Sequence, residues 1–201
     1  GNDASTANAN SLTMPSSAAS AGVNYSEIPA GNYAVQFDGT NDYVTFGNVS
    51  GLGLQTFTVE TWFKRIGAGS PISLGNSGIL AVPLIAKGSL ETGVTPANLN
   101  YFLGIGANNP VIFLDYVEGA EQNNAGLHHA IFGETPIVED VWHHTAVTFD
   151  GSVLRLYLDG NLEKVVEVGP DRLPGFTGVP YPALGAGMHP QGEPGAVCSG
   201  V

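Results

Sequence analysis

The feature that most constrains this chain is a series of short runs rich in Val, Ile, Thr, Tyr and Phe, separated by glycine and proline. The 28 glycines and 13 prolines make up more than a fifth of the 201 residues and have no fixed period. Such runs, bounded by turn formers, are typical of β-strands, and a helical period with caps is missing after the first 30 residues. The sequence therefore predicts an all-β chain with little or no helix. The expected strands are 33–37, 43–46, 57–65, 83–87, 100–105, 111–116, 128–132, 142–149, 153–158 and 162–168.

The alternation of apolar and polar residues indicates how these strands pack. In residues 57–64, Phe57, Val59 and Phe63 fall on one face, while Glu60 and Lys64 fall on the other. Because this many strands in one domain exceed a single open sheet, we predict a two-sheet antiparallel β-sandwich. Residues 153–158 end in Asp-Gly-Asn and the apolar pattern resumes at residue 162, which predicts a hairpin with a tight turn.

The chain divides into two parts by composition. Residues 1–30 are dominated by Ala, Ser, Asn and Gly and have neither hydrophobic period, so we expect a flexible N-terminal arm or linker. Residues 31–201 have the length of one β-sandwich domain.

The net charge and the number of cysteines restrict which molecules the chain can bind and in which cellular compartment it works. Six basic residues against 18 acidic ones give a formal charge of −12, which repels phosphate backbones, so we expect no nucleic acid as a partner. Apolar stretches reach nowhere near the 18 or so residues of a membrane span, so we expect no membrane insertion. The lone Cys198 has no internal partner, and the chain starts at Gly1. Together these features predict a processed or excised segment of an exported bacterial protein, secreted or displayed on the cell surface.

Four segments in order resemble a known family. They read AVQFDGTNDYV at 34–44, FTVETWF at 57–63, WHHTAVTFDG at 142–151 and LYLDG at 156–160. Their order and spacing resemble the bacterial laminin G-like, concanavalin A-like lectin/glucanase superfamily across residues 32–201. The resemblance implies a jelly roll. Members of that family usually close with a strand beyond the Gly-Val step at residues 200–201, so the resemblance also implies that the final strand lacks a counterpart here.

The turn DGTND at 38–42 gathers oxygen ligands between two strands. Carboxylate and carbonyl oxygens suit calcium. The resemblance implies that Asp38, Asn41 and Asp42 help to hold a structural calcium ion. The alternative is an Asx-type turn that is capped by its own side chains and binds no metal.

Candidate catalytic groups are few. The histidine pairs at 128–129 and 143–144 fall in predicted strands, where neighbours point to opposite faces, so we expect structural histidines rather than a chelate. The Glu-x-Asp-x-Glu pattern of sandwich-fold glycosidases is missing, and Glu118 and Glu121 fall in a predicted loop where carboxylates are usually solvated. We therefore expect no enzyme and no organic cofactor, with a glycoside hydrolase or polysaccharide lyase as the less favoured alternative.

Aromatic, amide and carboxylate side chains of the kinds that bind sugars gather in residues 98–128. We predict that a non-catalytic module binds a glycan or cell-surface polysaccharide there, in a carbohydrate-binding or adhesive role. The alternative is a structural spacer without a ligand, in which the aromatic residues are buried. The irregular stretches 67–81 and 117–127 are expected to supply ligand loops. The predicted ligand-binding residues are Tyr101, Asp115, Tyr116, Asn123, Asn124 and His128.

Overall fold

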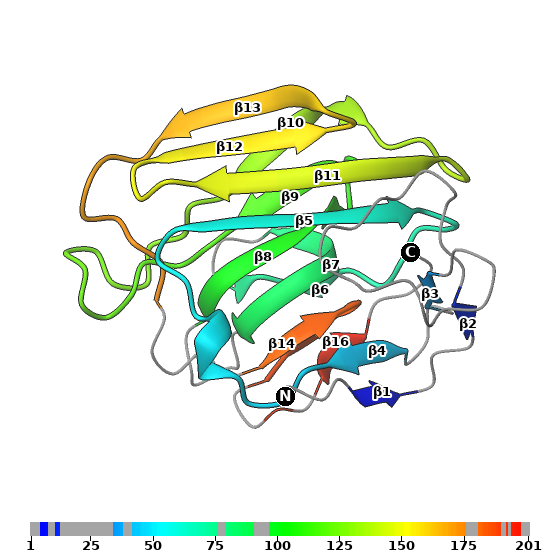
Figure 1. The fold of residues 1–201 in the computed structure, drawn as a ribbon, viewed down its shortest axis with the longest axis horizontal. Helices are drawn as coiled ribbons and strands as arrows, with labels where there is room; N and C mark the ends of the chain where they lie inside the picture. Colours follow the sequence, from blue (N-terminus) through cyan, green and yellow to red (C-terminus); the bar gives the residue numbers. More distant parts are fainter. Residues whose placement is uncertain are drawn as a thin grey trace, which may run out of the picture.

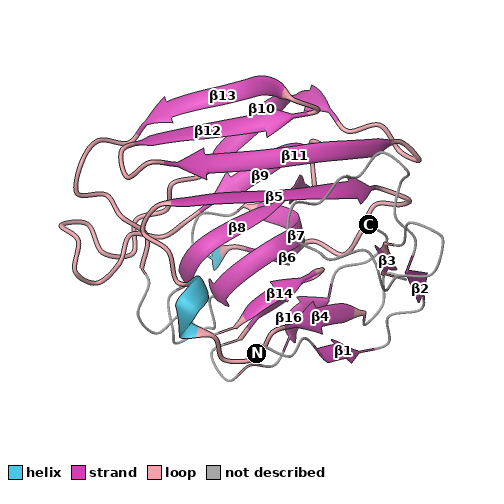
Figure 2. Cartoon of the chain, in the orientation of Figure 1, coloured by secondary structure: helices cyan, strands magenta, loops and turns pink. Residues whose placement is uncertain are grey.

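The computed structural model describes residues 34–37, 42–75, 79–90, 97–175, 181–189 and 192, together with the backbone of 5–7, 11–12 and 194–197. These residues form two main sheets stacked face to face, with the smaller sheet in the upper part of Figure 1. Strands and loops make up nearly all of the described chain, and a short 3-10 turn, η2 (Ser50–Leu52), precedes the smaller sheet (Figure 2). The all-β, two-sheet antiparallel sandwich predicted from the sequence is confirmed.

The larger sheet has ten strands among the described residues. Its main path runs in the order β1-β4-β14-β7-β8-β9-β10, with β6 and β15 also paired to β7 and β16 paired to β15. The strands are β1 (Ser5–Ala7), β4 (Tyr43–Thr45), β6 (Ile72–Ser73), β7 (Leu80–Ser89), β8 (Asn98–Gly106), β9 (Val111–Asp115), β10 (Ile131–Pro136), β14 (Pro182–Leu184), β15 (Ala186–Met188) and β16 (Pro194–Val197).

The smaller sheet has four described strands in the order β13-β12-β11-β5. They are β5 (Phe57–Lys64), β11 (Trp142–Phe149), β12 (Val153–Leu158) and β13 (Asn161–Glu167). In the β5/β11 pair, Phe57 lies opposite Phe149 and Trp62 lies opposite His144. The alternation along β5 and β11 thus points one set of side chains inward and the other outward, as the sequence predicts. A separate two-stranded sheet joins β2 (Ser11–Leu12) to β3 (Val35–Gln36).

The main hydrophobic core fills the space between the two sheets. Phe57, Phe149 and Leu156 from the smaller sheet pack with Leu103 and Leu114 from the larger one. Each fully buried side chain of this size contributes roughly 1.5–3 kcal/mol to stability. This layer is therefore the principal source of stability for the sandwich.

A second cluster covers the other face of the larger sheet. It contains Phe102, Phe113 and Val117, over which Ile72 and Leu74 pack from β6 and the residue after it. The central strands β8 and β9 are consequently buried on both faces. This explains why their sequences read as nearly continuous apolar runs.

The observed strand boundaries agree with the predicted ones where apolar and polar residues alternate clearly, and differ from them where the alternation is weak. The predictions 142–149 and 153–158 match β11 and β12, and the remaining runs from 57 onward correspond to β5, β7, β8, β9 and β13. The prediction 128–132 is wrong in its bounds, because β10 begins at Ile131 and continues to Pro136. His128 lies outside β10 and forms an isolated bridge to Val117.

The predicted hairpin is confirmed. β12 ends at Leu158 and β13 begins at Asn161, so Asp159 and Gly160 form a two-residue loop. Both loop residues have positive φ, 49° at Asp159 and 79° at Gly160. This combination suits the right-handed twist of the flanking strands, and aspartate and glycine are the residues that tolerate it.

The segment expected to be an arm contributes two short strands to the described structure. Ser5–Ala7 pairs with β4 and Ser11–Leu12 pairs with β3. The other residues up to 33 lie outside the described part of the chain. No helix among the described residues has the length and apolar character needed to cross a membrane.

Glu163 joins the edges of the two sheets. Its carboxylate accepts hydrogen bonds from the backbone N–H groups of Glu134 and Thr135 and from the Thr135 hydroxyl, each 2.8 Å long. Partial burial raises the pKa of the carboxyl, but these three hydrogen bonds outweigh it and hold the pKa of Glu163 below its ordinary value. The ionised form is therefore the one that stabilises the contact between β13 and β10.

Replacing Glu163 by glutamine is expected to cost about 1 kcal/mol at pH 7, because one amide acceptor replaces two charged oxygens. A carboxyl whose folded pKa is lowered stabilises the protein above its unfolded pKa, and that contribution is lost as the pH falls through the lower folded value. Urea unfolding at pH 7 and pH 3 should thus show a deficit at pH 7 that shrinks at pH 3. Glu167→Gln, an exposed residue of the same strand, is the matched control. Equal deficits in both variants would contradict the role given to Glu163.

Candidate functional site

The six predicted ligand-binding residues separate into buried and accessible groups. Tyr101 and Tyr116 belong to the core between the sheets. The Tyr101 ring lies 5.7 Å from the Phe57 ring, and burial raises the pKa of Tyr101 to about 12. The Tyr116 hydroxyl donates a 2.6 Å hydrogen bond to the Arg172 carbonyl oxygen. Neither ring presents a face to solvent, so both tyrosines act here as packing residues.

Asp115 and His128 are brought together on the opposite face of the larger sheet. Asp115 follows Leu114 on β9, so its side chain points away from the core between the sheets. Its Oδ2 lies 2.6 Å from His128 Nδ1, and the Asp115 side chain is fully buried whereas the imidazole is partly exposed. Burial raises the pKa of Asp115, while the hydrogen bond to His128 acts in the opposite direction. The buried carboxylate holds the imidazole in a fixed orientation at the surface.

Glu118 forms a second, neighbouring cluster, and the expectation that it is solvated is wrong. Its side chain is fully buried, and its Oε1 lies 2.7 Å from His129 Nε2 and 3.0 Å from Arg172 Nη1. Burial acts to raise the pKa of Glu118, but the hydrogen bonds from His129 and Arg172 leave it below its ordinary value. The His129 ring also stacks on Tyr116 at 4.6 Å. Glu118 thus positions one imidazole and one guanidinium at the end of the sheet.

The segment between these two clusters is a loop that closes on itself. Glu118 N–H donates to the Leu127 carbonyl, Gly126 N–H to the Glu118 carbonyl, and Leu127 N–H to the Asn124 carbonyl. Asn123 and Asn124 are exposed on this loop. We call residues 115–129 together with Arg172 the loop-118 site. It presents amide, imidazole and guanidinium groups on a hydrogen-bonded base. Five of the six predicted residues lie within it, although Tyr116 packs into the core.

The residues that sequence reasoning missed at this site are Glu118, His129 and Arg172. An isolated bridge between Glu118 and Pro174 brings Arg172 next to Glu118, although the two are 54 positions apart in sequence. A signal for the histidines was present, since residues 128–129 directly follow a loop with two glutamates. Nothing in the local sequence marks Arg172.

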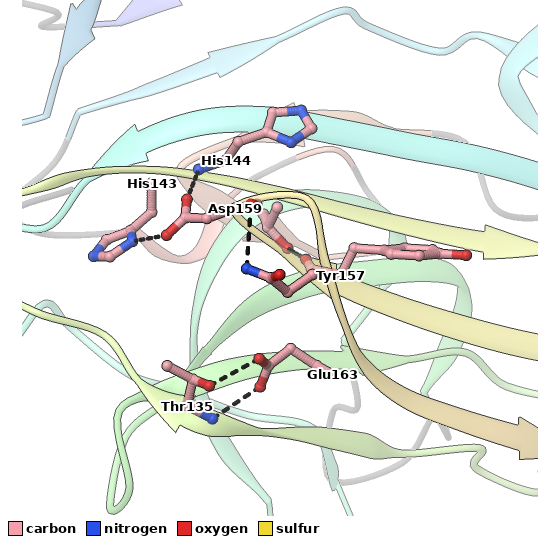
Figure 3. Close-up of polar contacts among 8 residues, drawn as sticks. Thr135, His143, His144, Tyr157, Asp159 and Glu163 are labelled. Carbon is pink, nitrogen blue, oxygen red and sulfur yellow. Dashed lines mark hydrogen bonds and ion pairs between the residues drawn. The ribbon is translucent and has the colours of Figure 1, made fainter.

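The other histidine pair lies near the start of β11 in the smaller sheet, beside Asp159 (Figure 3). His143 Nδ1 lies 2.7 Å from Asp159 Oδ2, while the backbone N–H of His144 donates a 2.8 Å hydrogen bond to Asp159 Oδ1. The two imidazoles point away from each other in Figure 3, as expected for neighbours on a strand. His143 is buried against Phe63, at 5.7 Å between rings, and serves packing and turn formation.

Calcium binding at Asp38, Asn41 and Asp42 stays a prediction. Asp38 and Asn41 lie outside the described residues, and Asp42 is fully buried just before β4. Within the described part of the chain, His, Cys, Asp and Glu side chains do not gather in threes around a point that would suit a metal ion.

The comparisons with known proteins agree with this architecture. A carbohydrate-binding module, CBM40, of the Ruminococcus gnavus IT-sialidase has a TM-score of 0.55 at 14% identity in its complex with α2,3-sialyllactose, covering 77% of this chain and 79% of that one. Its complex with α2,6-sialyllactose gives 0.54 at 15% identity, covering 77% and 80%.

The enzymatically active domain of tailspike protein 2 from bacteriophage CBA120 has a TM-score of 0.52 at 16% identity, covering 85% of this chain but 24% of that one. At these identities the likeness concerns the fold. The sequence matches no curated protein. The model of the concanavalin A-like lectin/glucanases superfamily, however, matches residues 38–196, which is most of the chain. The chain therefore belongs to the concanavalin A-like lectin/glucanases superfamily.

Proposed function

We propose that this chain is a non-catalytic carbohydrate-binding module of an exported protein, and that it binds glycans at the loop-118 site. The observation that carries the proposal is the way in which Asp115 and Glu118, both fully buried, hold His128, His129 and Arg172 beneath a loop with exposed asparagines. Sugar hydroxyls are bound by side chains of these kinds when a rigid base fixes their orientation.

An aromatic surface lies on the same face of the larger sheet. Phe132 is opposite Phe113 in the β9/β10 pair, with ring centroids 4.7 Å apart, and 41% of Phe132 is exposed. His128 bonds to Asp115 and Phe132 packs on Phe113, so both lie on the side of the sheet that carries Asp115 and Phe113. Apolar faces of pyranose rings stack on such side chains. The complexes of the R. gnavus module with sialyllactose support a glycan as the ligand class.

The state of the carboxylates supports a non-catalytic role. Glycoside hydrolysis uses one carboxyl to protonate the leaving group and another as nucleophile or base, both reaching the scissile bond. Asp115 and Glu118 are instead buried and hydrogen-bonded to histidines. In this arrangement the carboxylates position other side chains rather than contact a substrate.

Replacing Asn123 and Asn124 by alanine together is expected to weaken glycan binding at least about tenfold, or about 1.4 kcal/mol, with little change in stability because both side chains are exposed. A glycan array with the wild-type protein identifies the ligand, with 3′- and 6′-sialyllactose and lactose as initial probes. Isothermal titration calorimetry then compares the affinities of wild type and variant.

The matched control is Asn108→Ala with Asn109→Ala, since these residues form another exposed Asn-Asn pair, between β8 and β9. That control should keep wild-type affinity. An array on which the wild-type protein binds no glycan would refute the proposed function and favour a spacer. Equal affinity in both double variants would place the binding elsewhere on the molecule.

A further inference from the structure

A second surface with sugar-binding chemistry lies on the outward face of the smaller sheet, the face turned away from the core. The alternation along β5 points Glu60 and Trp62 outward, since the adjacent residues Val59 and Phe63 pack against or within the core. Trp62 keeps 38% of its surface exposed, although a large aromatic ring gains considerable stability from burial. Nothing in the main core or in the loop-118 site accounts for a tryptophan at this position.

Polar groups of complementary character flank the Trp62 indole. Its ring centroid lies 5.2 Å from that of His144, which is its direct partner on β11. His144 Nε2 lies 3.6 Å from Glu60 Oε2, and the Glu60 side chain is largely exposed. An aromatic face, an imidazole and a carboxylate therefore converge within two neighbouring strands.

The small side chain of Ala146, on β11 next to Glu60, leaves space for a sugar ring beside these groups. The register places Ala146 of β11 between Glu60 of β5 and Tyr157 of β12. Ala146 is partly exposed and extends only a methyl group from the sheet. The longer side chains of Glu60 and Tyr157 consequently flank the Ala146 methyl group on this face.

The backbone under this surface is held firmly. The Asp159 carboxylate accepts a hydrogen bond from the His144 N–H (Figure 3). The Asp159 N–H donates a 2.7 Å hydrogen bond to the His144 carbonyl. His143 binds the other oxygen of the same carboxylate. The turn therefore fixes the His144 backbone through both its N–H and its C=O, which holds the strand that carries the imidazole in place before any ligand arrives.

From these contacts we propose that the Trp62 face, defined by Glu60, Trp62, His144, Ala146 and Tyr157, binds an uncharged pyranose. The sugar's C–H face stacks on the indole, one hydroxyl donates to the Glu60 carboxylate, and another hydroxyl bonds to His144. An acidic sugar is disfavoured because the exposed Glu60 and the net charge of −12 both repel anions.

This inference extends the proposed function by adding a second sugar site on the other sheet, so that one copy of the chain contacts two glycans. A second copy of the chain is the competing occupant, because Leu162 and Val165 on β13 are also exposed. A stable protein interface needs about 800 Å² from each partner, far more than one indole provides. The two occupants are separated by measuring the oligomeric state.

The test is titration of the protein with laminarihexaose and cellohexaose, both neutral, followed by tryptophan fluorescence and calorimetry. We expect saturable binding that Trp62→Ala weakens at least tenfold and Trp62→Phe weakens only about threefold or less, since the phenyl ring preserves stacking. Val138→Ala, which shortens an exposed apolar side chain outside the Trp62 face, should leave the affinity unchanged. Circular dichroism and the thermal midpoint verify that each variant is folded.

The outcomes keep the two sites distinct. The Asn123→Ala, Asn124→Ala variant should retain binding of the neutral hexasaccharides while losing that of the loop-118 ligand. Unchanged hexasaccharide affinity in Trp62→Ala, no binding of either hexasaccharide by wild type, or a wild-type dimer that Trp62→Ala dissociates would each overturn the Trp62 site. A wild-type protein that binds array glycans but neither hexasaccharide leaves the loop-118 proposal standing and refutes this one alone.

Discussion

Glu118→Ala is expected to lower the free energy of unfolding by about 2–4 kcal/mol at pH 7 and to weaken glycan binding at the loop-118 site at least about tenfold. Hydrogen bonds to a charged group contribute roughly 1.5–3 kcal/mol each, and removal of this buried carboxylate leaves His129 and Arg172 without their shared acceptor. The lower part of the range allows for the partial exposure of Arg172, 35% of its side chain. Urea unfolding and calorimetric titration with the array ligand measure the two effects.

The pH dependence of this deficit follows from the lowered pKa of Glu118. A carboxyl of that kind contributes stability above its unfolded pKa, near the ordinary 4.5, and loses the contribution as the pH falls through the lower folded value. The difference between wild type and variant should therefore shrink as the pH falls below the ordinary carboxyl pKa and through the lower folded one. Glu139→Ala is the matched control, because the exposed Glu139 side chain forms an ion pair with Arg65, 3.7 Å apart, at the edge of the protein, where such pairs are worth about 0–1 kcal/mol. A loss in Glu118→Ala no greater than in this control would show that the buried cluster is not stabilising.

The largest loss of stability is expected for Gly88→Ala, about 3 kcal/mol or more. Gly88 lies in β7 with φ of +129°, a conformation that costs a residue with a side chain on the order of 1–3 kcal/mol. An added Cβ would collide with the Asn98 carbonyl oxygen and lie 2.8 Å from the Leu99 Cα, and both are backbone atoms of the adjacent strand. Neither can move without breaking the β7/β8 register, so overpacking adds roughly 1–3 kcal/mol.

Gly51→Ala provides the comparison for this change. A Cβ at Gly51 meets nothing within 4 Å, and its φ lies outside the left-handed range. The same substitution there should be neutral or stabilising by up to about 1 kcal/mol, because alanine restricts the unfolded chain. Chemical denaturation of both variants measures their free energies of unfolding. A Gly88→Ala protein as stable as Gly51→Ala would mean that the β7/β8 pair adapts to a side chain at this position.

The strands of the smaller sheet were well predicted from the sequence because one face of this sheet is exposed to solvent and the other is buried in the core. In β11 and β12, buried and less buried residues alternate without interruption. The two-residue period of the strands and the positions of their ends can therefore both be predicted from the sequence. β14 and β15 were missed because they are three residues long, flank Gly185 and consist largely of small residues. Their pairing with β7, β4 and β16 depends on long-range contacts that leave no local period.

The site was harder to predict because burial on both faces of β8 and β9 hides the direction in which each side chain points. Asp115 and Tyr116 were predicted to share a ligand, yet neighbours in an extended segment diverge, and Tyr116 joins Ile112 and Leu114 in the core. The grouping of Asp115 with His128 was correct as a contact, at 2.6 Å. The contribution of Arg172 depends on the fold alone, since it crosses to Glu118 from a distant segment.

The loop between Glu118 and Leu127 has a consequence for engineering. Its ends are joined by their own backbone hydrogen bonds, and Asp115, His128 and His129 are anchored outside it. New sequences between Gly119 and Gly126 would therefore replace the exposed surface without removing the side chains that support it. A combinatorial library confined to these residues would turn the sandwich into a general scaffold for selecting new binding specificities, in the manner of an antibody loop grafted on a fixed framework.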